Sequence, residues 1–200
     1  MKPLVLLTAV ALLCGAGTGA LAYKPQTGDI VFHTSASAQS VAVQAATHSR
    51  YSHMGVVIVR KGQPWVLEAV QPVQYTRLQA WLDRGTGRHY VIKRLKAPLT
   101  DAQMGAMATQ GQAFVGKPYD LTFEWNDDRI YCSELVWKLY RSSAGIELSP
   151  LSQLGSFDLS SAVVKAKLKE RYADHVPLDH PVVPPSAIFD SSLLATVDQR

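Results

Sequence analysis

The chain has 200 residues, of which 18% are charged and 47% are hydrophobic, and its formal net charge is +4. These values are ordinary for a globular protein, and no basic run with interleaved aromatic residues points to a nucleic-acid-binding protein. Beyond the amino end, no apolar stretch reaches the ~18 residues that a membrane span needs.

The amino end has the pattern of a secretory signal peptide. Lys2 supplies a positive charge, residues 4–13 form an almost unbroken apolar run, and Ala20-Leu21-Ala22 is a small-x-small cleavage site. We therefore expect cleavage after Ala22 and export to a periplasm or the medium. Residues 23–200 are expected to form a single domain with no stable membrane anchor. A lipoprotein start at Cys14 is disfavoured because two bulky leucines precede it.

The mature chain alternates short apolar runs with turn-forming residues. Strands are expected at 30–32, 52–59, 65–70, 74–76 and 90–95, with a tight hairpin turn at Lys61-Gly62. Helices are expected at 35–48, 100–114, 162–172 and from Cys132 to a stop at Gly145, with helical turns at 78–83 and 186–189. Residues 177–185 are proline-rich and extended.

The helix at 162–172 is basic, and we expect its charged side chains to form a solvated face: Lys165, Lys167, Lys169 and Arg171. Strands are concentrated in the first half of the chain, and helices flank them. This order predicts an α+β fold with an antiparallel sheet.

Cys132 opens an amphipathic helix, because Cys132, Leu135, Val136 and Leu139 recur at helical spacing. A thiol in the first helical turn lies beside unpaired N–H groups and the positive end of the helix dipole. Both stabilise a thiolate, and the N–H groups bind an oxyanion formed next to it. Once Cys14 is removed, no second cysteine remains to form an internal disulfide. The alternative is a small apolar residue that fills the core.

A nucleophilic cysteine needs a base, and the base needs an orienting group. Among the six histidines, only His53 begins a buried strand that turns back on a carboxylate. A two-residue turn places Gly55 opposite Glu68, so that Glu68 is the diagonal, same-face neighbour of His53 at a Cα separation of about 7–8 Å. Burying Glu68 among apolar residues is costly without a partner, and His53 relieves that cost. A purely structural His–Glu pair is the alternative.

Two groups of segments resemble the NlpC-type papain-like cysteine peptidases. Residues 116–119 (Gly-Lys-Pro-Tyr) with 131–136 (Tyr-Cys-Ser-Glu-Leu-Val) are similar to the nucleophile region, and residues 28–32, 53–58 and 67–69 to the histidine region. Here the histidine precedes the cysteine, as in the circularly permuted YaeF/YiiX-like branch, and the likeness extends over nearly the whole mature chain. Two positions differ from many members of the wider family: Tyr131 stands in place of an aspartate, and Glu134 in place of a glycine.

The resemblance implies a circularly permuted papain-like fold and a Cys132–His53–Glu68 triad that hydrolyses amide bonds through an acyl-enzyme. The implied substrate is a peptide or acyl amide, and the range of substrates includes peptides derived from the cell wall. Tyr131 and Tyr119 are candidates for the substrate pocket or for a second oxyanion donor, while Tyr119 also fits a packed structural aromatic. The sequence shows no metal-ligand spacing and implies no cofactor. Lipid acyl transfer or thioester hydrolysis on the same fold, and a non-catalytic binding module, are the alternatives.

Overall fold

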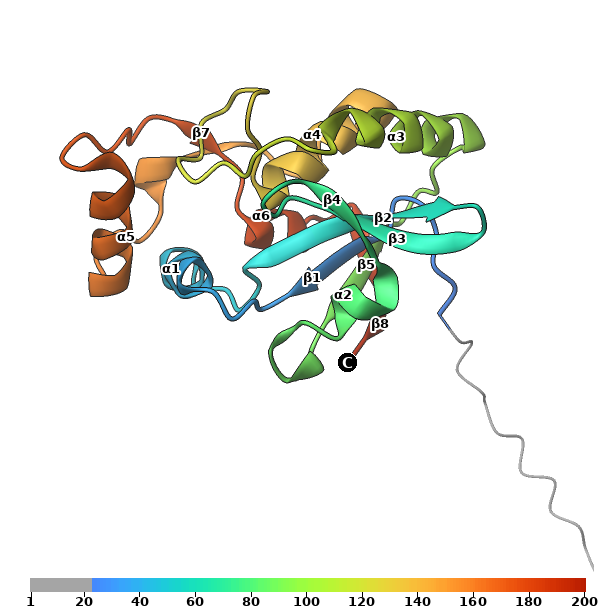
Figure 1. Cartoon of the computed structure of the whole chain (residues 1–200), viewed down its shortest axis with the longest axis horizontal. Coiled ribbons are helices and arrows are strands. Elements are labelled where there is room, and N and C mark those ends of the chain that lie inside the picture. Colours follow the sequence, from blue (N-terminus) through green and yellow to red (C-terminus); the bar gives the residue numbers. More distant parts are fainter. Residues whose placement is uncertain (1–22) are drawn as a thin grey trace, which may run out of the picture.

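The computed structural model describes residues 23–200, so the expected signal peptide lies outside the described residues. An antiparallel sheet with the strand order β4-β3-β2-β1-β5-β8 forms the centre of the molecule (Figure 1). Its strands are β1 Ile30–His33, β2 His53–Arg60, β3 Gln63–Glu68, β4 Gln74–Arg77, β5 Val91–Leu95 and β8 Leu194–Gln199. The expected α+β class is therefore confirmed.

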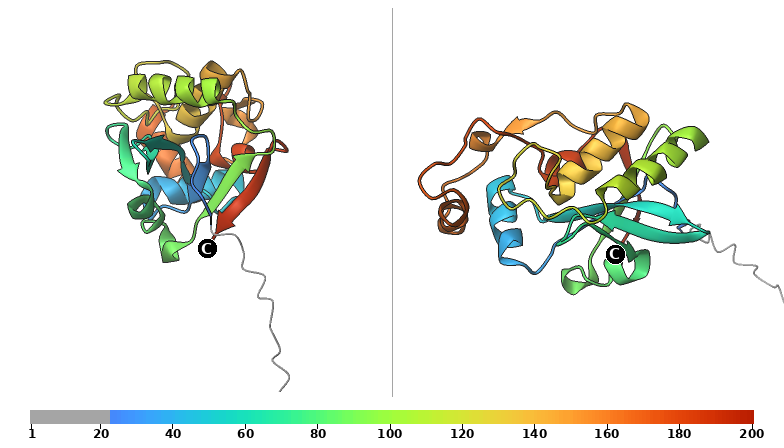
Figure 2. Two further views of the ribbon diagram at one scale, coloured as in Figure 1. Left: turned by 90° about the vertical axis from the view of Figure 1, so that its right-hand side faces the viewer. Right: turned by 45° about the horizontal axis from the view of Figure 1, so that its top comes forward.

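Helices cover both faces of this sheet. α3 (Asp101–Phe114) and α4 (Cys132–Ala144) lie together on one face, and the short α2 (Leu78–Leu82) lies on the other (Figures 1 and 2). Side chains alternate along each strand, so Ile30 and Phe32 pack toward α4 while Val31 packs toward α2. The strands are thus buried on both sides, which fixes their register.

A second group of elements lies beside the sheet. α1 (Ala38–Thr47) and α5 (Ala162–Tyr172) pack against each other, and α6 (Pro185–Phe189) packs against α4 (Figure 1). The two-residue strands β6 (Ser152–Gln153) and β7 (Pro181–Val182) pair with each other, and 3₁₀ turns occur at Thr86–Arg88 and Leu154–Ser156. From Tyr23 onward, no helix is long and apolar enough to cross a membrane.

Most of the expected elements occur within a few residues of their predicted positions. The hairpin register is confirmed, because Arg60 pairs with Gln63 and Val56 pairs with Leu67. The caps are also as expected. Thr100 and Gln103 form a capping box on α3, and Gly145 ends α4 in a left-handed conformation with φ 71°.

Two expectations need correction. The carboxyl-terminal residues form β8, which pairs with β5 at the edge of the sheet, although strands were expected only in the first half of the chain. In addition, the basic residues of α5 are not all solvated. Lys165 and Lys169 are exposed, but Arg171 is partly buried and its Nη2 donates to Gln39 Oε1 at 2.8 Å.

Candidate active site

Cys132 is the first residue of α4. The residue before it, Tyr131, is the N-cap with an extended backbone (φ −100°, ψ 168°). The helix buries Leu135 and Leu139 completely against the sheet, and this anchors its first turn over β2. Cys132 itself is 4% exposed. The thiol therefore lies at the positive end of the helix, almost removed from water.

His53 and Glu68 meet at the end of the β2–β3 hairpin. His53 begins β2 and Glu68 ends β3, and the hairpin register brings their side chains to the same face. His53 Nε2 lies 2.8 Å from Glu68 Oε2, and both side chains are largely or wholly removed from solvent. Because Nε2 is engaged with Glu68, Nδ1 is the ring nitrogen left for another partner.

The second partner of His53 is Cys132. The imidazole lies close enough to the thiol for each group to shift the pKa of the other, and the backbone N–H groups of Met54 and Ser133 also act on the thiol. Burial alone would raise the pKa of the Cys132 thiol, but its interactions with His53 and with these N–H groups lower it below its ordinary value. Burial would likewise lower the pKa of His53, but its interactions with Cys132 and Glu68 raise it to about 9. Each group of the pair therefore favours the charged form of the other.

Glu68 is held by four donors and is completely buried. Besides His53, its oxygens accept from Thr76 Oγ1 at 2.6 Å, from Trp81 Nε1 at 2.8 Å and from Arg84 Nη2 at 2.6 Å to each oxygen. Burial would raise the pKa of this carboxyl, but the bond from His53 and the other contacts lower it to about 2. Glu68 is therefore ionised at every pH at which the protein is expected to work.

Sequence reasoning missed these three additional partners of Glu68. Thr76 could have been identified by the reasoning that identified His53 as a diagonal neighbour of Glu68. Gln74 lies opposite Glu68, and Thr76 is two residues further along β4. Trp81 and Arg84 come from α2 and the turn after it. The sequence predicted a helical turn at 78–83, but no periodic pattern indicated that this segment would pack against Glu68.

A second histidine lies behind His53. The His33 ring stacks on Trp81 at a centroid distance of 4.1 Å and lies 5.3 Å from the His53 ring. Burial, followed by the neighbouring His53, lowers the pKa of His33 to about 3. His33 is therefore neutral beside the protonated His53, and its stacking helps to keep the Trp81 indole directed at Glu68.

Two hollows are lined by residues next to Cys132 in the chain or in space. A polar cleft of about 480 Å³ contains His53, Tyr119, Arg84, Gln71 and several serines of the segment that leads into α1. An apolar cavity lies between α1, α5 and the β7–α6 segment, and its lining surface is almost entirely apolar. Tyr131 lines the apolar cavity and Tyr119 lines the polar cleft, so the two tyrosines face different compartments.

Hydrogen-bonded side chains centred on Gln39 separate the two hollows. Gln39 lines both, its Nε2 donates to the Tyr119 hydroxyl at 2.8 Å, and its Oε1 accepts from Arg171. The Tyr131 hydroxyl accepts from the Val183 N–H at 3.1 Å, and Tyr131 is 3% exposed. Tyr131 is thus a packed wall residue. Burial raises the pKa of both tyrosine hydroxyls, and the charge of the Cys132 thiolate raises both further.

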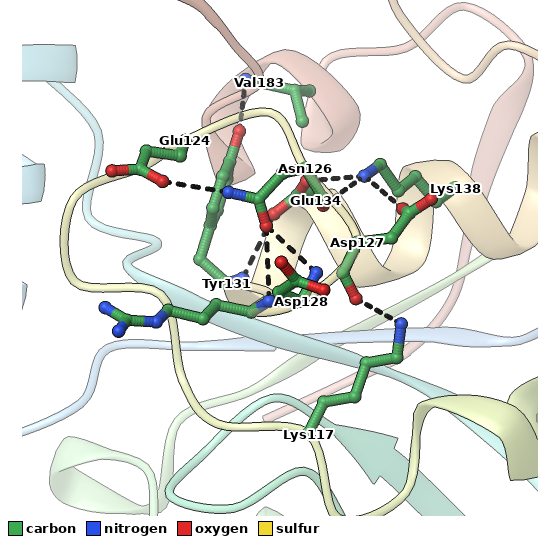
Figure 3. A network of polar contacts seen from close by, with 10 residues as sticks. Lys117, Glu124, Asn126, Asp127, Asp128, Tyr131, Glu134, Lys138 and Val183 are labelled. Atoms are coloured by element: carbon green, nitrogen blue, oxygen red, sulfur yellow. Dashed lines mark hydrogen bonds and ion pairs between the residues drawn. The ribbon is translucent and has the colours of Figure 1, made fainter.

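The long loop between α3 and α4 is braced by Lys138 (Figure 3). Lys138 Nζ donates to Asn126 O at 2.7 Å and to Asp127 Oδ1 at 2.8 Å, and Lys117 Nζ donates to Asp127 O. These bonds tie the middle of the loop to α4 and to the first residues of the loop itself. The loop in turn carries Tyr119 at its start and Tyr131 at its end, so the brace supports both walls of the site.

Glu134 lies beneath this brace. Its Oε1 forms an ion pair with Lys138 Nζ at 2.9 Å, although the approach angle is not that of a hydrogen bond, and its Oε2 accepts from the Tyr131 N–H at 3.3 Å. Burial raises the pKa of Glu134 to about 7, and Lys138 only partly offsets this effect. Ser133, the other residue near the nucleophile, donates to Val183 O at 2.7 Å and is 1% exposed, with no base beside it.

Comparison with known proteins yields matches over most of the chain. An uncharacterised protein of Escherichia coli K12, YiiX, is 48% identical over 178 residues, which cover 89% of this chain and 88% of YiiX. A crystal structure of YiiX from Escherichia coli O157:H7 matches with a TM-score of 0.86 and 47% identity, and the match covers 89% of this chain and 99% of that one.

That crystal structure is described as one of a metalloprotein. In the part of the present chain that the structure describes, no three His, Cys, Asp or Glu side chains gather in a way that could hold a metal ion. Glu68, the carboxylate that contacts His53, is already bound to the Arg84 guanidinium, which would repel a metal cation. These residues do not fit a metal ion.

The family model that matches residues 24–198 is that of the permuted papain-like amidases of the YaeF/YiiX type, the C92 family. It spans nearly all of the described chain, and the order of His53 before Cys132 agrees with its permuted topology. The chain therefore belongs to this family of cysteine peptidase and amidase-type hydrolases.

Proposed function

We propose that Cys132, His53 and Glu68 form a catalytic triad that hydrolyses amide bonds through an acyl-enzyme. The observation that carries this proposal is the close grouping of three buried side chains: His53 Nε2 lies 2.8 Å from Glu68 Oε2, and the Cys132 thiol is near enough to His53 for each to shift the pKa of the other. Glu68 favours the imidazolium form of His53, and His53 favours the thiolate form of Cys132. These are the charged forms that the reaction needs. A structural His–Glu pair would not require the thiol at its other end.

The reaction follows from the positions of these groups. The Cys132 thiolate attacks the amide carbon, and the carbonyl oxygen becomes an oxyanion. His53 Nδ1 then gives its proton to the leaving nitrogen, the C–N bond breaks, and a thioester remains on Cys132. Water attacks the thioester with His53 as base, which releases the acid and restores the thiol. Glu68 keeps Nε2–H oriented and stabilises the imidazolium throughout.

Two donors fit the oxyanion. The Cys132 backbone N–H is unpaired within α4 because it belongs to the first helical turn. The Tyr119 hydroxyl, held by Gln39, is the second candidate, since it lies in the polar cleft close to the thiol. Tyr131 contributes the wall of the apolar cavity instead.

The proposed substrate is a peptide or another acyl amide, which includes peptides released from the cell wall, and the proposed location is outside the cytoplasm. Support for export comes from the amino-terminal pattern alone. Mass spectrometry of the protein from the exported fraction tests it. A chain that begins at Tyr23 supports export, and an acylated start at Cys14 contradicts the proposed processing.

The triad is tested by intact-mass analysis and amine release. The purified protein is mixed with a panel of N-acyl peptides, and the expected results are free amine and a transient acyl mass on Cys132. Cys132→Ala should abolish both signals, and His53→Ala should reduce them by about 10³-fold or more. Amine release that survives Cys132→Ala would refute the proposal.

A second candidate, acyl transfer or thioester hydrolysis, is favoured by one observation. Tyr131, the residue directly before Cys132, lines the apolar cavity, and the almost wholly apolar lining suits a hydrocarbon chain. Octanoyl thioesters and octanoyl amides, compared with their acetyl counterparts, distinguish the two candidates. Efficient turnover of long-chain thioesters together with no turnover of any amide would replace the amidase proposal with this one.

A further inference from the structure

The polar cleft beside His53 has an unusual charge balance. Its lining contains one permanently charged side chain, Arg84, and no carboxylate. Apart from His53 itself, the other polar groups are neutral: serine hydroxyls, the amides of Gln39 and Gln71, the Tyr119 hydroxyl, and His33, whose pKa is lowered to about 3 by burial and by His53. Glu68 lies behind this surface and is completely buried. The cleft therefore presents donors and a cation to a ligand, and no negative charge.

The Arg84 guanidinium uses only one of its nitrogens to bind Glu68. Its Nη2 binds both Glu68 oxygens, and within residues 23–200 its other N–H groups have no hydrogen-bond partner. The side chain is 43% exposed into the cleft, whereas Glu68 is not exposed at all. A guanidinium with free N–H groups at a cleft wall is suited to a carboxylate, which accepts two parallel hydrogen bonds from it.

Arg84 lines the same cleft as His53 and lies beyond the Nε2 end of its ring. The leaving nitrogen contacts Nδ1, which protonates it, while Glu68 Oε2 lies 2.8 Å from His53 Nε2 and 2.6 Å from Arg84 Nη2. An extended residue spans about 3.3 Å. A leaving group of about two residues that runs along the cleft past the ring therefore brings its terminal carboxylate within reach of the free N–H groups.

We propose that Arg84 is a specificity residue that binds a free carboxylate on the amine half of the substrate. The inference rests on the proposed amidase function and narrows its substrate to acyl amides whose leaving amine is an amino acid or short peptide with an unblocked carboxyl end. The apolar cavity and the polar cleft then receive opposite halves of one molecule. Arg84 holds the departing half while it also supports Glu68.

The test separates these two roles of Arg84. Pairs of substrates share one acyl group and carry either a free carboxylate or a carboxamide at the end of a glycine or glycylglycine leaving group. The wild-type protein should prefer the carboxylate by about 5- to 30-fold in kcat/KM, as expected for a partly solvated charge-assisted contact. Arg84→Gln should abolish the preference, whatever it does to the overall rate. Arg77→Gln, which removes an exposed arginine that stacks on Trp65 outside the cleft, is the matched control and should retain the preference.

Each alternative result overturns the inference. Equal rates for the paired substrates in the wild-type protein would show that no carboxylate is bound. A slower Arg84→Gln variant that keeps the full preference would show that Arg84 acts only through Glu68. If Arg84→Gln does not fold, the preference of the wild-type protein for the carboxylate substrate is measured from about 0.05 M to about 0.5 M salt. A preference of electrostatic origin shrinks over this range, and an unchanged preference contradicts the inference.

A binding measurement keeps the inference separate from the amidase proposal. Glycylglycine and glycylglycinamide are titrated into Cys132→Ser and followed by NMR, with no turnover required. Tighter binding of the free dipeptide, lost in Cys132→Ser/Arg84→Gln, supports the carboxylate site even if no amide is hydrolysed. Equal binding of the two probes, or binding of neither, contradicts it.

Discussion

Glu68→Gln removes the negative charge of the proposed triad while nearly preserving its shape. The Trp81 indole donates to Oε2, the same oxygen that faces His53. The carbonyl oxygen of a glutamine is therefore favoured at that position, and its NH₂ group is directed at Thr76. The His53 tautomer is retained, and what disappears is the charge that stabilises the imidazolium.

The magnitude follows from these contacts. A hydrogen bond to a charged group contributes about 1.5–3 kcal/mol, so we expect kcat/KM to fall by about 10- to 150-fold. The protein should also lose about 1–3 kcal/mol of stability, because Arg84 Nη2 loses one of its two acceptors. For a domain of this size, that loss lowers Tm by about 2–10 °C.

The assay is a double-mutant cycle. Amine release and melting are measured for the wild-type protein, Glu68→Gln, His53→Ala and the double variant. If the two residues act as one unit, Glu68→Gln costs little once His53 is absent. Thr76→Val is the matched control, since it removes one hydrogen bond to Glu68 but keeps the charge, and its rate should fall by less than about fivefold.

Two results would refute this reasoning. The effects of Glu68→Gln and His53→Ala on rate could multiply, which would show that the residues act independently. Alternatively, Glu68→Gln could unfold the protein while the folded fraction keeps its full rate. In either case Glu68 would be structural, and the third member of the triad would lie elsewhere.

Two further predictions concern the surroundings of the triad. The pKa of Glu134 is raised to about 7 in the folded protein from an ordinary value of 4.5, so the folded state holds an extra proton between these values and stability falls as pH rises through them. Glu134→Gln should abolish this decline of about 3 kcal/mol, measured by urea unfolding at pH 5 and pH 7.5, and an unchanged slope would contradict the assignment. Tyr119→Phe should lower kcat by about 10- to 10²-fold with little change in KM or Tm if its hydroxyl binds the oxyanion. A fall in Tm without a fall in kcat would make Tyr119 a structural residue.

The His53–Glu68 contact was predictable because it depends on local geometry. The Lys61-Gly62 turn fixes the register of one hairpin, and register fixes which side chains share a face. The position of Cys132 at a helix start was predictable for a similar reason, since the apolar spacing of one helix is visible in the sequence. Both facts involve segments that are close together in the chain.

The remaining features depend on contacts between distant segments. β8 contains few apolar residues and becomes a strand only through pairing with β5. Gln39 and Tyr119 are joined across 80 positions, and Arg171 and Gln39 across 132. The apolar cavity is assembled from α1, α5 and the β7–α6 segment, none of which indicates a cavity alone. Packing, rather than periodicity, creates these features, so the sequence pattern did not reveal them.

The most direct test of the central claim is the pH dependence of Cys132 alkylation by iodoacetamide, compared between the wild-type protein and His53→Ala. An ordinary thiol with a pKa near 8.5 is less than about 1% ionised at pH 6. With the Cys132 pKa lowered and the His53 pKa raised to about 9, the wild-type thiol should react at pH 6 at least about tenfold faster than a free thiol. His53→Ala should shift its alkylation profile to higher pH. A thiol that reacts only after unfolding, or whose profile is the same without His53, would contradict the existence of an activated Cys132–His53 pair.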